Sequence, residues 1–243
     1  MAKKKSARNQ IHLFKGTIRP RRRALILPRY LSDEASKTKH RGKEQDQALE
    51  IVKRWINLEK GGHLKKKETQ LDANFLHEVF GDALGYAPST TSPEAWQLER
   101  NYNISGVGTA DGALGNFKPN NLSDVAVVIE LKGADTDLDR DKFNGRTPVQ
   151  QCWDYLNALP HCPWGIVSNF VTTRLYHREK TPQVYEEFHL KDLNDLNRFR
   201  DFYCLFGIRG LLRSVLGQKP LAFQLLEQTE NRQQEVGAEL YNA

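Results

Sequence analysis

The sequence predicts an α/β protein in which helices cover both faces of a β-sheet. Apolar residues first recur at helical spacing, the period then changes from about 3.6 to about 2 residues, and strand-like and helical segments follow in turn. The chain has 243 residues, which suit one domain of ordinary size. Its 39% hydrophobic and 27% charged residues are globular proportions and exclude wholesale disorder.

The N-terminal third is predicted to be an arm followed by two helices. Residues 11–30 have short apolar pieces between prolines and arginines, which indicates an extended arm with room for one strand, and residues 32–42 indicate a polar linker. Helical spacing covers residues 44–59 and ends at Gly61-Gly62. A second helix begins near Thr69, whose hydroxyl could cap it, and stops at Gly85.

The remaining segments alternate between strands and helices, with a turn over residues 115–122 and a charged loop over 135–146. The aspartates of that loop lack the central glycine and final glutamate of a calcium loop, so a solvated acidic loop is favoured. The predicted strands are 103–107, 109–114, 125–131, 164–168, 173–177 and 184–190. The predicted helices are 148–159, 193–216 with a break near 207–210, and 221–240, which is polar with a thin apolar stripe.

Charge is distributed unevenly along the chain. Residues 1–43 hold 14 Lys/Arg against 2 Asp/Glu, a net charge of +12, and the other 200 residues carry a net charge of −6. A basic arm indicates a polyanionic partner, because each neutralised phosphate releases a counterion. An acidic body indicates carboxylates that could gather around a cation.

Membrane and secretory classes are not favoured. No stretch approaches the roughly 20 apolar residues of a membrane span. The lysines near the N-terminus precede no apolar core, so they do not form a secretory signal. The three cysteines, Cys152, Cys162 and Cys204, form no CxxC pair and indicate a reduced, cytoplasmic setting.

A candidate catalytic cluster surrounds the buried strand at residues 125–131. Strand side chains alternate, so Glu130 and Lys132 emerge on one face. Asp111 lies 19 residues before Glu130, and a hairpin would bring the two carboxylates together. Burying such charges is costly unless they are paired or used.

Two adjacent carboxylates favour Mg²⁺, which binds a few oxygen ligands together with water and substrate phosphate. The metal would stabilise charge on a phosphate and lower the pKa of a bound water. Lys132 would then orient or deprotonate that water and stabilise the anionic transition state. The alternative interpretation is a solvated strand end with a local ion pair.

These residues resemble a known nuclease core. Asp111, the Glu130-Leu131-Lys132 segment and the following helix are similar to the PD-(D/E)XK superfamily, some branches of which carry a Gln-x-x-x-Tyr element like Gln151 to Tyr155. An ordered set over about residues 44–216 resembles the N-terminal nuclease region of type IIG restriction–modification enzymes. Its pieces are Glu68-Thr-Gln-Leu, Phe75-Leu, Phe80-Gly-Asp-Ala-Leu-Gly85-Tyr86, Thr109-Ala-Asp111-Gly, Ile129-Glu130-Leu-Lys132, Thr147-Pro-Val-Gln-Gln151 with Tyr155, and Ser168-Asn169-Phe170 with Leu175-Tyr176.

The resemblance implies a restriction-endonuclease-like core with a mixed central β-sheet flanked by helices. It implies Mg²⁺-dependent hydrolysis of DNA by a type II, IIG-like site-specific deoxyribonuclease. Asp111 and Glu130 would be metal ligands, helped by the Leu131 carbonyl. Lys132 would act on the water, Gln151 would touch that water or a phosphate, and Tyr155 would orient its neighbours.

A glutamate from the second helix is a further candidate metal ligand. Helical projection places Glu68 on the side of the apolar stripe and Glu78 at its edge. Glu68 is favoured, because a carboxylate on the buried side is best explained by a metal or a water bridge. The alternative is an acidic residue that stabilises the helix N-terminus.

Partners and domain limits follow from the same resemblance. Residues 1–43 would be a basic arm, 44–216 the nuclease domain and 217–243 the start of a helical connector, without the methyltransferase that follows in such enzymes. The chain would then be a fragment, a truncated product or a separate subunit. Double-stranded DNA is the expected substrate, held partly by Arg21–Arg23 and Lys65–Lys67. We also expect a partner methyltransferase or specificity module and transient dimerisation on DNA.

Three other functions are compatible with the sequence. One is a stand-alone repair or mobile-element nuclease, which would need no methyltransferase. Another is a non-catalytic DNA-binding subunit in which the carboxylates are remnants. A ribonuclease is the third, because nothing in the sequence shows how a 2′-hydroxyl would be read.

Overall fold

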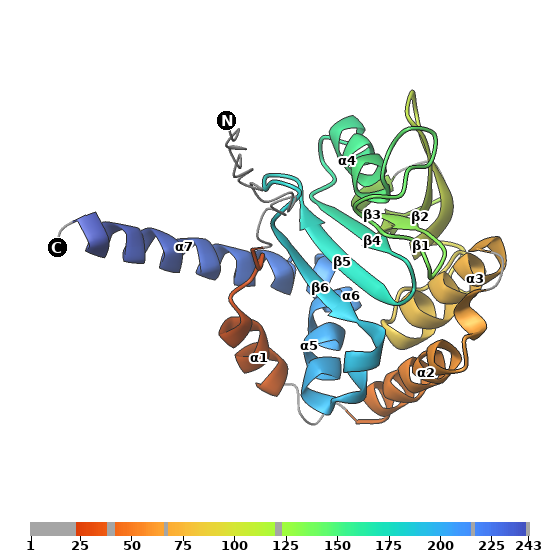
Figure 1. Cartoon of the computed structure of the whole chain (residues 1–243), viewed down its shortest axis with the longest axis horizontal. Helices are drawn as coiled ribbons and strands as arrows, with labels where there is room; N and C mark the ends of the chain where they lie inside the picture. Colours follow the sequence, from red (N-terminus) through yellow and green to blue (C-terminus); the bar gives the residue numbers. More distant parts are fainter. Residues whose placement is uncertain (1–22, 38–41, 66–67, 120–122, 215–216, 242–243) are drawn as a thin grey trace, which may run out of the picture.

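The computed structural model describes residues 23–37, 42–65, 68–119, 123–214 and 217–241 (Figure 1). The helices are α1 (Pro28–Lys37), α2 (Gly42–Lys60), α3 (Glu68–Phe75), which continues as a π-helix (Leu76–Ala83), α4 (Pro148–Ala158), α5 (Leu196–Phe206), α6 (Ile208–Leu211) and α7 (Leu221–Tyr241), with short 3₁₀ turns at His63–Lys65 and Leu190–Asn194. The strands are β1 (Trp96–Ile104), β2 (Gly108–Phe117), β3 (Ser123–Leu131), β4 (Trp164–Ser168), β5 (Thr172–His177) and β6 (Tyr185–His189).

Six strands form one mixed sheet in the order β1-β2-β3-β4-β5-β6. Neighbouring strands are antiparallel except β3 and β4, which run parallel and are joined through α4. The predicted α/β class with a helix-flanked sheet is therefore confirmed. The finer similarity to a restriction endonuclease stays a prediction.

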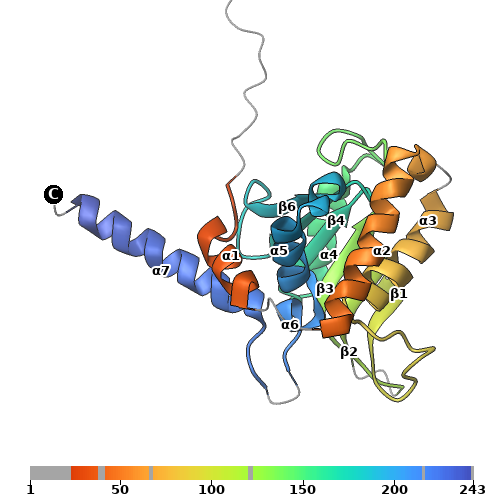
Figure 2. The same ribbon diagram turned by 90° about the horizontal axis from the view of Figure 1, so that it is seen from below.

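Helices cover both faces of the sheet. Figures 1 and 2 show α2, α3 and α5 on one face and α4 on the other. The β3 strand contributes to both cores, because Val127, Ile129 and Leu131 pack in the cluster with α2 and α5, whereas Val128 packs in the cluster with α4. Glu130 follows the parity of Val128 and therefore lies on the α4 side.

A glycine in β4 allows α4 to lie close to the sheet. A Cβ atom at Gly165 would lie 2.5 Å from the Cys152 Sγ of α4 and 3.1 Å from Leu156. The absence of a side chain at Gly165 thus brings the helix that carries Gln151 near the end of β3.

The N-terminal prediction is wrong for part of the described chain. Residues 32–37, expected in a polar linker, belong to α1, where Leu31 and Ala35 are buried against the domain. Leu25 and Ile26 of the expected arm also lie in the core, and Arg23 pairs with Val184 next to the β6 edge. Tertiary burial overrides the polar composition here, since two apolar side chains one turn apart are enough to dock a short helix.

Other boundaries also differ from the prediction. The first strand, predicted at residues 103–107, is β1 at Trp96–Ile104. Helix α3 begins at Glu68, one residue before the predicted start at Thr69. The β2 strand runs on to Phe117, beyond the point where the turn was expected. It does so through a register shift at Gly115, where a Cβ would lie 2.3 Å from the Asp124 carbonyl oxygen.

Helix α7 is attached to the domain at its first turns. Phe223 packs against Trp164 and His177, with ring centroids 5.1 and 5.6 Å apart, and Leu225 and Leu226 are buried. The rest of α7 extends away from the sheet (Figure 1). None of the described helices is both long enough and apolar enough to cross a membrane. All three cysteines are buried, and none of them forms a disulfide.

The docking of α7 predicts a pH dependence of stability. Burial lowers the pKa of His177 below its usual value of 6.5, and Lys180 opposes its charge further, although Glu179 and Glu230 act the other way. The unfolded chain therefore binds the proton first, and stability is lost as the pH falls below 6.5. When the pH is lowered from about 7.5 to about 5, we expect the free energy of unfolding, measured in urea, to fall less for His177→Phe than for the wild type. A constant difference between the two proteins across this range would contradict the prediction.

Candidate active site

The end of β3 brings Asp111 and Glu130 together. The register pairs Gly112 with Ile129, and continuing it by one residue places Asp111 across from Glu130. The strands are held there by the Asp111 carboxylate, whose Oδ2 accepts a hydrogen bond from the Leu131 backbone N–H at 2.7 Å. The sequence prediction that a hairpin joins the two acids therefore agrees with the geometry.

Glu130 and Lys132 form a buried ion pair. Only 1% of Glu130 and 8% of Lys132 is exposed. The Lys132 Nζ donates to Glu130 Oε1 at 2.5 Å and to the Leu131 carbonyl oxygen at 2.9 Å. The ammonium group is thus fixed by two acceptors, and one of them is the carbonyl expected to help a metal.

Burial makes the Glu130 carboxylate unusually basic. Loss of solvent, followed by the nearby charge of Asp111, raises the pKa of Glu130 to about 7, although Lys132 opposes this rise. The second oxygen, Oε2, is buried and accepts no hydrogen bond of normal geometry from the described residues, although the Tyr155 hydroxyl interacts with this carboxylate. A buried carboxylate of this kind is stabilised by a cation that reaches it.

The Tyr155 hydroxyl links Gln151 to β2, the strand that carries Asp111. The Gln151 Nε2 donates to the Tyr155 hydroxyl at 2.6 Å, and this hydroxyl donates to the Thr109 carbonyl oxygen at 3.0 Å. Burial and the nearby Glu130 charge raise the pKa of Tyr155. Tyr155 therefore fixes Gln151 relative to β2, as an orienting residue would.

The N-terminus of α4 is fixed by a capping box. The Thr147 hydroxyl accepts from the Gln150 backbone N–H at 3.2 Å, and the Gln150 side chain accepts from the Thr147 backbone N–H at 2.9 Å. Pro148 occupies the first helical position. Gln150 is exposed, as predicted, but it caps the helix instead of being merely solvated.

Of the two candidate helix glutamates, the structure describes the side chain of Glu78 but not that of Glu68. Glu68 begins α3, but its side chain lies outside the described residues. Glu78 lies in the π-helix and accepts from Trp55 Nε1 and Arg54 Nη2, both at 2.8 Å. Glu78 therefore joins the π-helix to α2, and its place is explained by these contacts.

The residues present fit a Mg²⁺ ion. Asp111 and Glu130 offer two carboxylates, and Mg²⁺ often takes one or two carboxylates and completes its shell with water and phosphate. The burial of Glu130 Oε2 without a hydrogen bond of normal geometry from the described residues is the observation that favours this fit. Within the described ranges, no group of three or more His, Cys, Asp or Glu side chains could hold a metal, and Glu68 is not part of that comparison.

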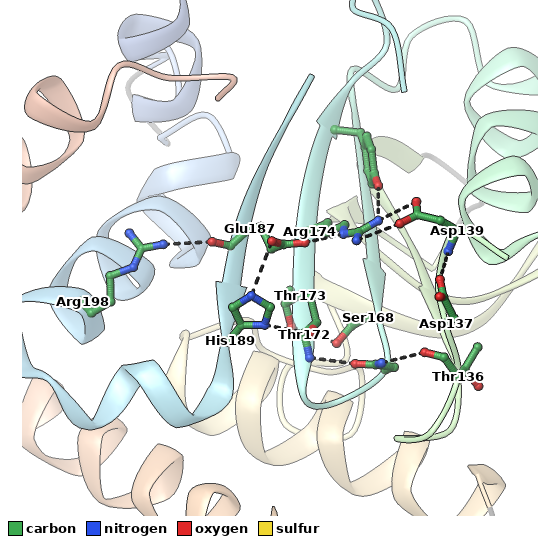
Figure 3. Close-up of polar contacts among 12 residues, drawn as sticks. Thr136, Asp137, Asp139, Ser168, Thr172, Thr173, Arg174, Glu187, His189 and Arg198 are labelled. Atoms are coloured by element: carbon green, nitrogen blue, oxygen red, sulfur yellow. Dashed lines mark hydrogen bonds and ion pairs between the residues drawn. The ribbon is translucent and has the colours of Figure 1, made fainter. Parts of the chain in front are cut away.

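The acidic loop after β3 is part of a polar network that the sequence did not reveal (Figure 3). Arg174 of β5 is 11% exposed and donates to both Asp139 carboxylate oxygens, at 2.8 and 3.1 Å. Its Nε donates to Glu187 of β6 at 2.7 Å. The expectation of a merely solvated loop is therefore wrong for Asp139, which ties the loop to the sheet. Sequence could not show this, because the two partners lie 35 residues apart.

Other contacts hold the same loop. Asn169 donates to the Thr136 carbonyl oxygen at 2.9 Å and accepts from the Thr172 backbone N–H at 2.7 Å. Leu138 is 4% exposed. Lys65, predicted to contact DNA, lies 3.2 Å from Asp135. Lys66, Lys67, Arg21 and Arg22 lie outside the described residues.

Comparison with known proteins returned no match, either among protein-family models, among curated proteins or among solved structures. The site is therefore interpreted from its own residues.

The polar network predicts that Asp139 controls the order of the loop. Asp139→Ala removes the two-oxygen contact with the nearly buried Arg174, so we expect faster amide hydrogen exchange over residues 133–146 and a loss of about 1–2 kcal/mol in unfolding free energy. Asp135→Ala is the matched control, because its contact with Lys65 is exposed on both sides. Equal exchange in the two variants would show that Asp139 does not hold the loop.

Proposed function

We propose that the protein is a Mg²⁺-dependent DNA endonuclease with a restriction-endonuclease-like core, corresponding to the nuclease portion of a type IIG-like restriction–modification system. The observation that carries this proposal is the convergence of Asp111, Glu130 and Lys132 at the end of one strand. The ordered motifs around these residues support it, because Asp111 lies in β2, Glu130 in β3 and Gln151 in α4, the helix that follows β3.

Each residue has a distinct role in the proposed reaction. Asp111 and Glu130 would hold Mg²⁺, which when bound would stabilise charge on the phosphate and make a water more acidic. Lys132 would lie beside the scissile phosphate, orient the attacking water and stabilise the anionic transition state. The attacking water gives up a proton to solvent, or to Lys132 once its amine has released its own proton; the water oxygen forms a new P–O bond, the bond to the leaving oxygen breaks, and the leaving oxygen takes up a proton.

Gln151 would support the same step from α4. Its amide oxygen is left to accept a hydrogen bond while its nitrogen donates to Tyr155. That oxygen can accept from the attacking water, which must be held in line with the leaving group. Tyr155 acts as a positioning residue, since its hydroxyl is engaged with Gln151 and Thr109.

One observation favours a second candidate, a DNA-binding subunit without catalysis. The Glu130–Lys132 pair is closed and almost fully buried, as a structural remnant of a site would be. Plasmid nicking by the wild-type chain in Mg²⁺ and in EDTA separates the candidates. DNA binding without metal-dependent cutting would favour the remnant and remove the enzyme.

The first prediction of this proposal concerns Lys132. We expect Lys132→Ala to lower the nicking rate by at least about 100-fold, because it removes both proton transfer and charge stabilisation. Lys132→Arg should fail equally, since a guanidinium group does not release its proton. Lys180→Ala, which breaks the Lys180–Glu230 ion pair far from the site, is the control and should keep wild-type nicking. Unchanged nicking by Lys132→Ala would remove the mechanism.

The second prediction concerns Asp111. Calorimetric titration with Mg²⁺ alone should show at least about 10-fold weaker binding to Asp111→Asn than to the wild type, because an amide oxygen carries no net charge. The control is Asp154→Asn, whose carboxylate pairs with Arg146 and lies in α4. Equal Mg²⁺ affinity in the wild type and Asp111→Asn would end the metal-site assignment.

A further inference from the structure

The loop between β3 and α4 carries a tight turn at Phe143-Asn144-Gly145-Arg146. Phe143 and Arg146 exchange both backbone hydrogen bonds, at 2.8 and 3.2 Å. The central residues Asn144 and Gly145 have φ values of 52° and 83°. Positive φ at both central positions defines a type I′ turn, for which Asn-Gly is the preferred pair. The conformation of this turn is therefore specified by its own sequence.

Phe143 is held at the surface beside the candidate site. It is 36% exposed, and no other Phe, Trp or Tyr side chain that the structure describes is as exposed. The Lys132 ammonium group lies 5.2 Å from the centre of its ring. A phenylalanine in this position forms part of the surface above the Lys132–Glu130 pair.

Arg146 lies at the other side of the same turn. Its side chain is 40% exposed, and its Nη1 donates to Asp154 of α4 at 2.8 Å. Arg146 pairs across the turn with Phe143, whose ring lies 5.2 Å from the Lys132 ammonium group, so the turn brings Arg146 to the side of the candidate site. A guanidinium group has five N–H donors, so one bond to Asp154 leaves donors that a phosphate can accept.

The loop below the turn is rigidly supported. The Asp139 carboxylate is held by Arg174, the Thr136 carbonyl oxygen by Asn169, and the Thr147 end by the capping box of α4. The turn is therefore a preorganised element, and contacts made from such an element lose little conformational entropy on binding.

We propose, building on the proposed nuclease function, that this turn is a DNA-contacting element of the site. Arg146 binds a backbone phosphate next to the scissile one, and Phe143 packs against a neighbouring base and loosens its stacking. Apolar side chains that unstack base steps and arginines that bind phosphates are established ways of holding DNA.

Binding measurements separate the two contacts. Fluorescence anisotropy with a 40-bp duplex that carries 2-aminopurine at several adenine positions, with Ca²⁺ in place of Mg²⁺, reports affinity and base unstacking together. For Arg146→Ala we expect binding about 3- to 10-fold weaker and a slope of log affinity against log salt that is shallower by about 1. Arg232→Ala is the matched control, because Arg232 is 39% exposed and also paired with a carboxylate, Glu235.

Phe143→Ala should weaken binding on the order of 10-fold without changing the salt slope, and it should abolish the rise in 2-aminopurine fluorescence. Phe143→Trp should restore both readouts. Val236→Ala, at a similarly exposed apolar residue of α7, is the control and should leave both unchanged. Urea unfolding of each variant confirms that the fold is intact.

The outcomes distinguish this inference from the proposed function. If the wild type cuts DNA in Mg²⁺ but both turn variants bind with wild-type affinity, slope and fluorescence, the inference is overturned and the nuclease stands. Lost cutting with unchanged binding and fluorescence in Phe143→Ala also overturns it, since the residue would then act only by packing on Lys132. A wild type that neither binds nor cuts DNA overturns both proposals.

Discussion

The burial of one carboxylate at the end of the central strand β3 constrains everything around it. Glu130 is almost inaccessible, so its charge must be balanced by Lys132 from the same face of the strand. Both side chains of the pair are buried because β3 lies inside the sheet, between β2 and β4, and under α4. The same burial raises the pKa of Glu130, and its Oε2 atom accepts no hydrogen bond of normal geometry from the described residues. The packing around the end of β3 and the proposed chemistry thus both depend on the buried Glu130–Lys132 ion pair.

A second buried charge organises the loop beside that pair. Arg174 lies between Asp139 and Glu187 (Figure 3). It also packs over the ring of Tyr185, with 4.6 Å between the guanidinium carbon and the ring centre. Because Asp139 belongs to the segment that follows β3, this contact fixes the loop from which the Phe143 turn projects. The acidic residues that might suggest a calcium loop therefore serve to hold a neighbouring surface in place.

The proposed function is supported by local agreement between chemistry and geometry. Two carboxylates, a lysine and an amide come from β2, β3 and α4, and each is positioned by a contact that its element explains. The carboxylate of Asp111 takes a backbone N–H of β3, and Tyr155 links Gln151 to β2. Convergence of this kind is informative because each position is set by a different part of the fold.

Periodicity and turn chemistry in the sequence determined the order of helices and strands from α2 onward, the alternation of β3 and the meeting of Asp111 with Glu130. These features depend on local rules, such as side-chain parity and hairpin return. Tertiary structure alone decided the rest: the docking of α1, the engagement of Glu78 with Trp55, the Arg174–Asp139 contact and the position of Phe143 over Lys132. Each of these depends on contacts between residues that lie far apart in the chain. The spacing of residue types along the sequence does not predict such contacts.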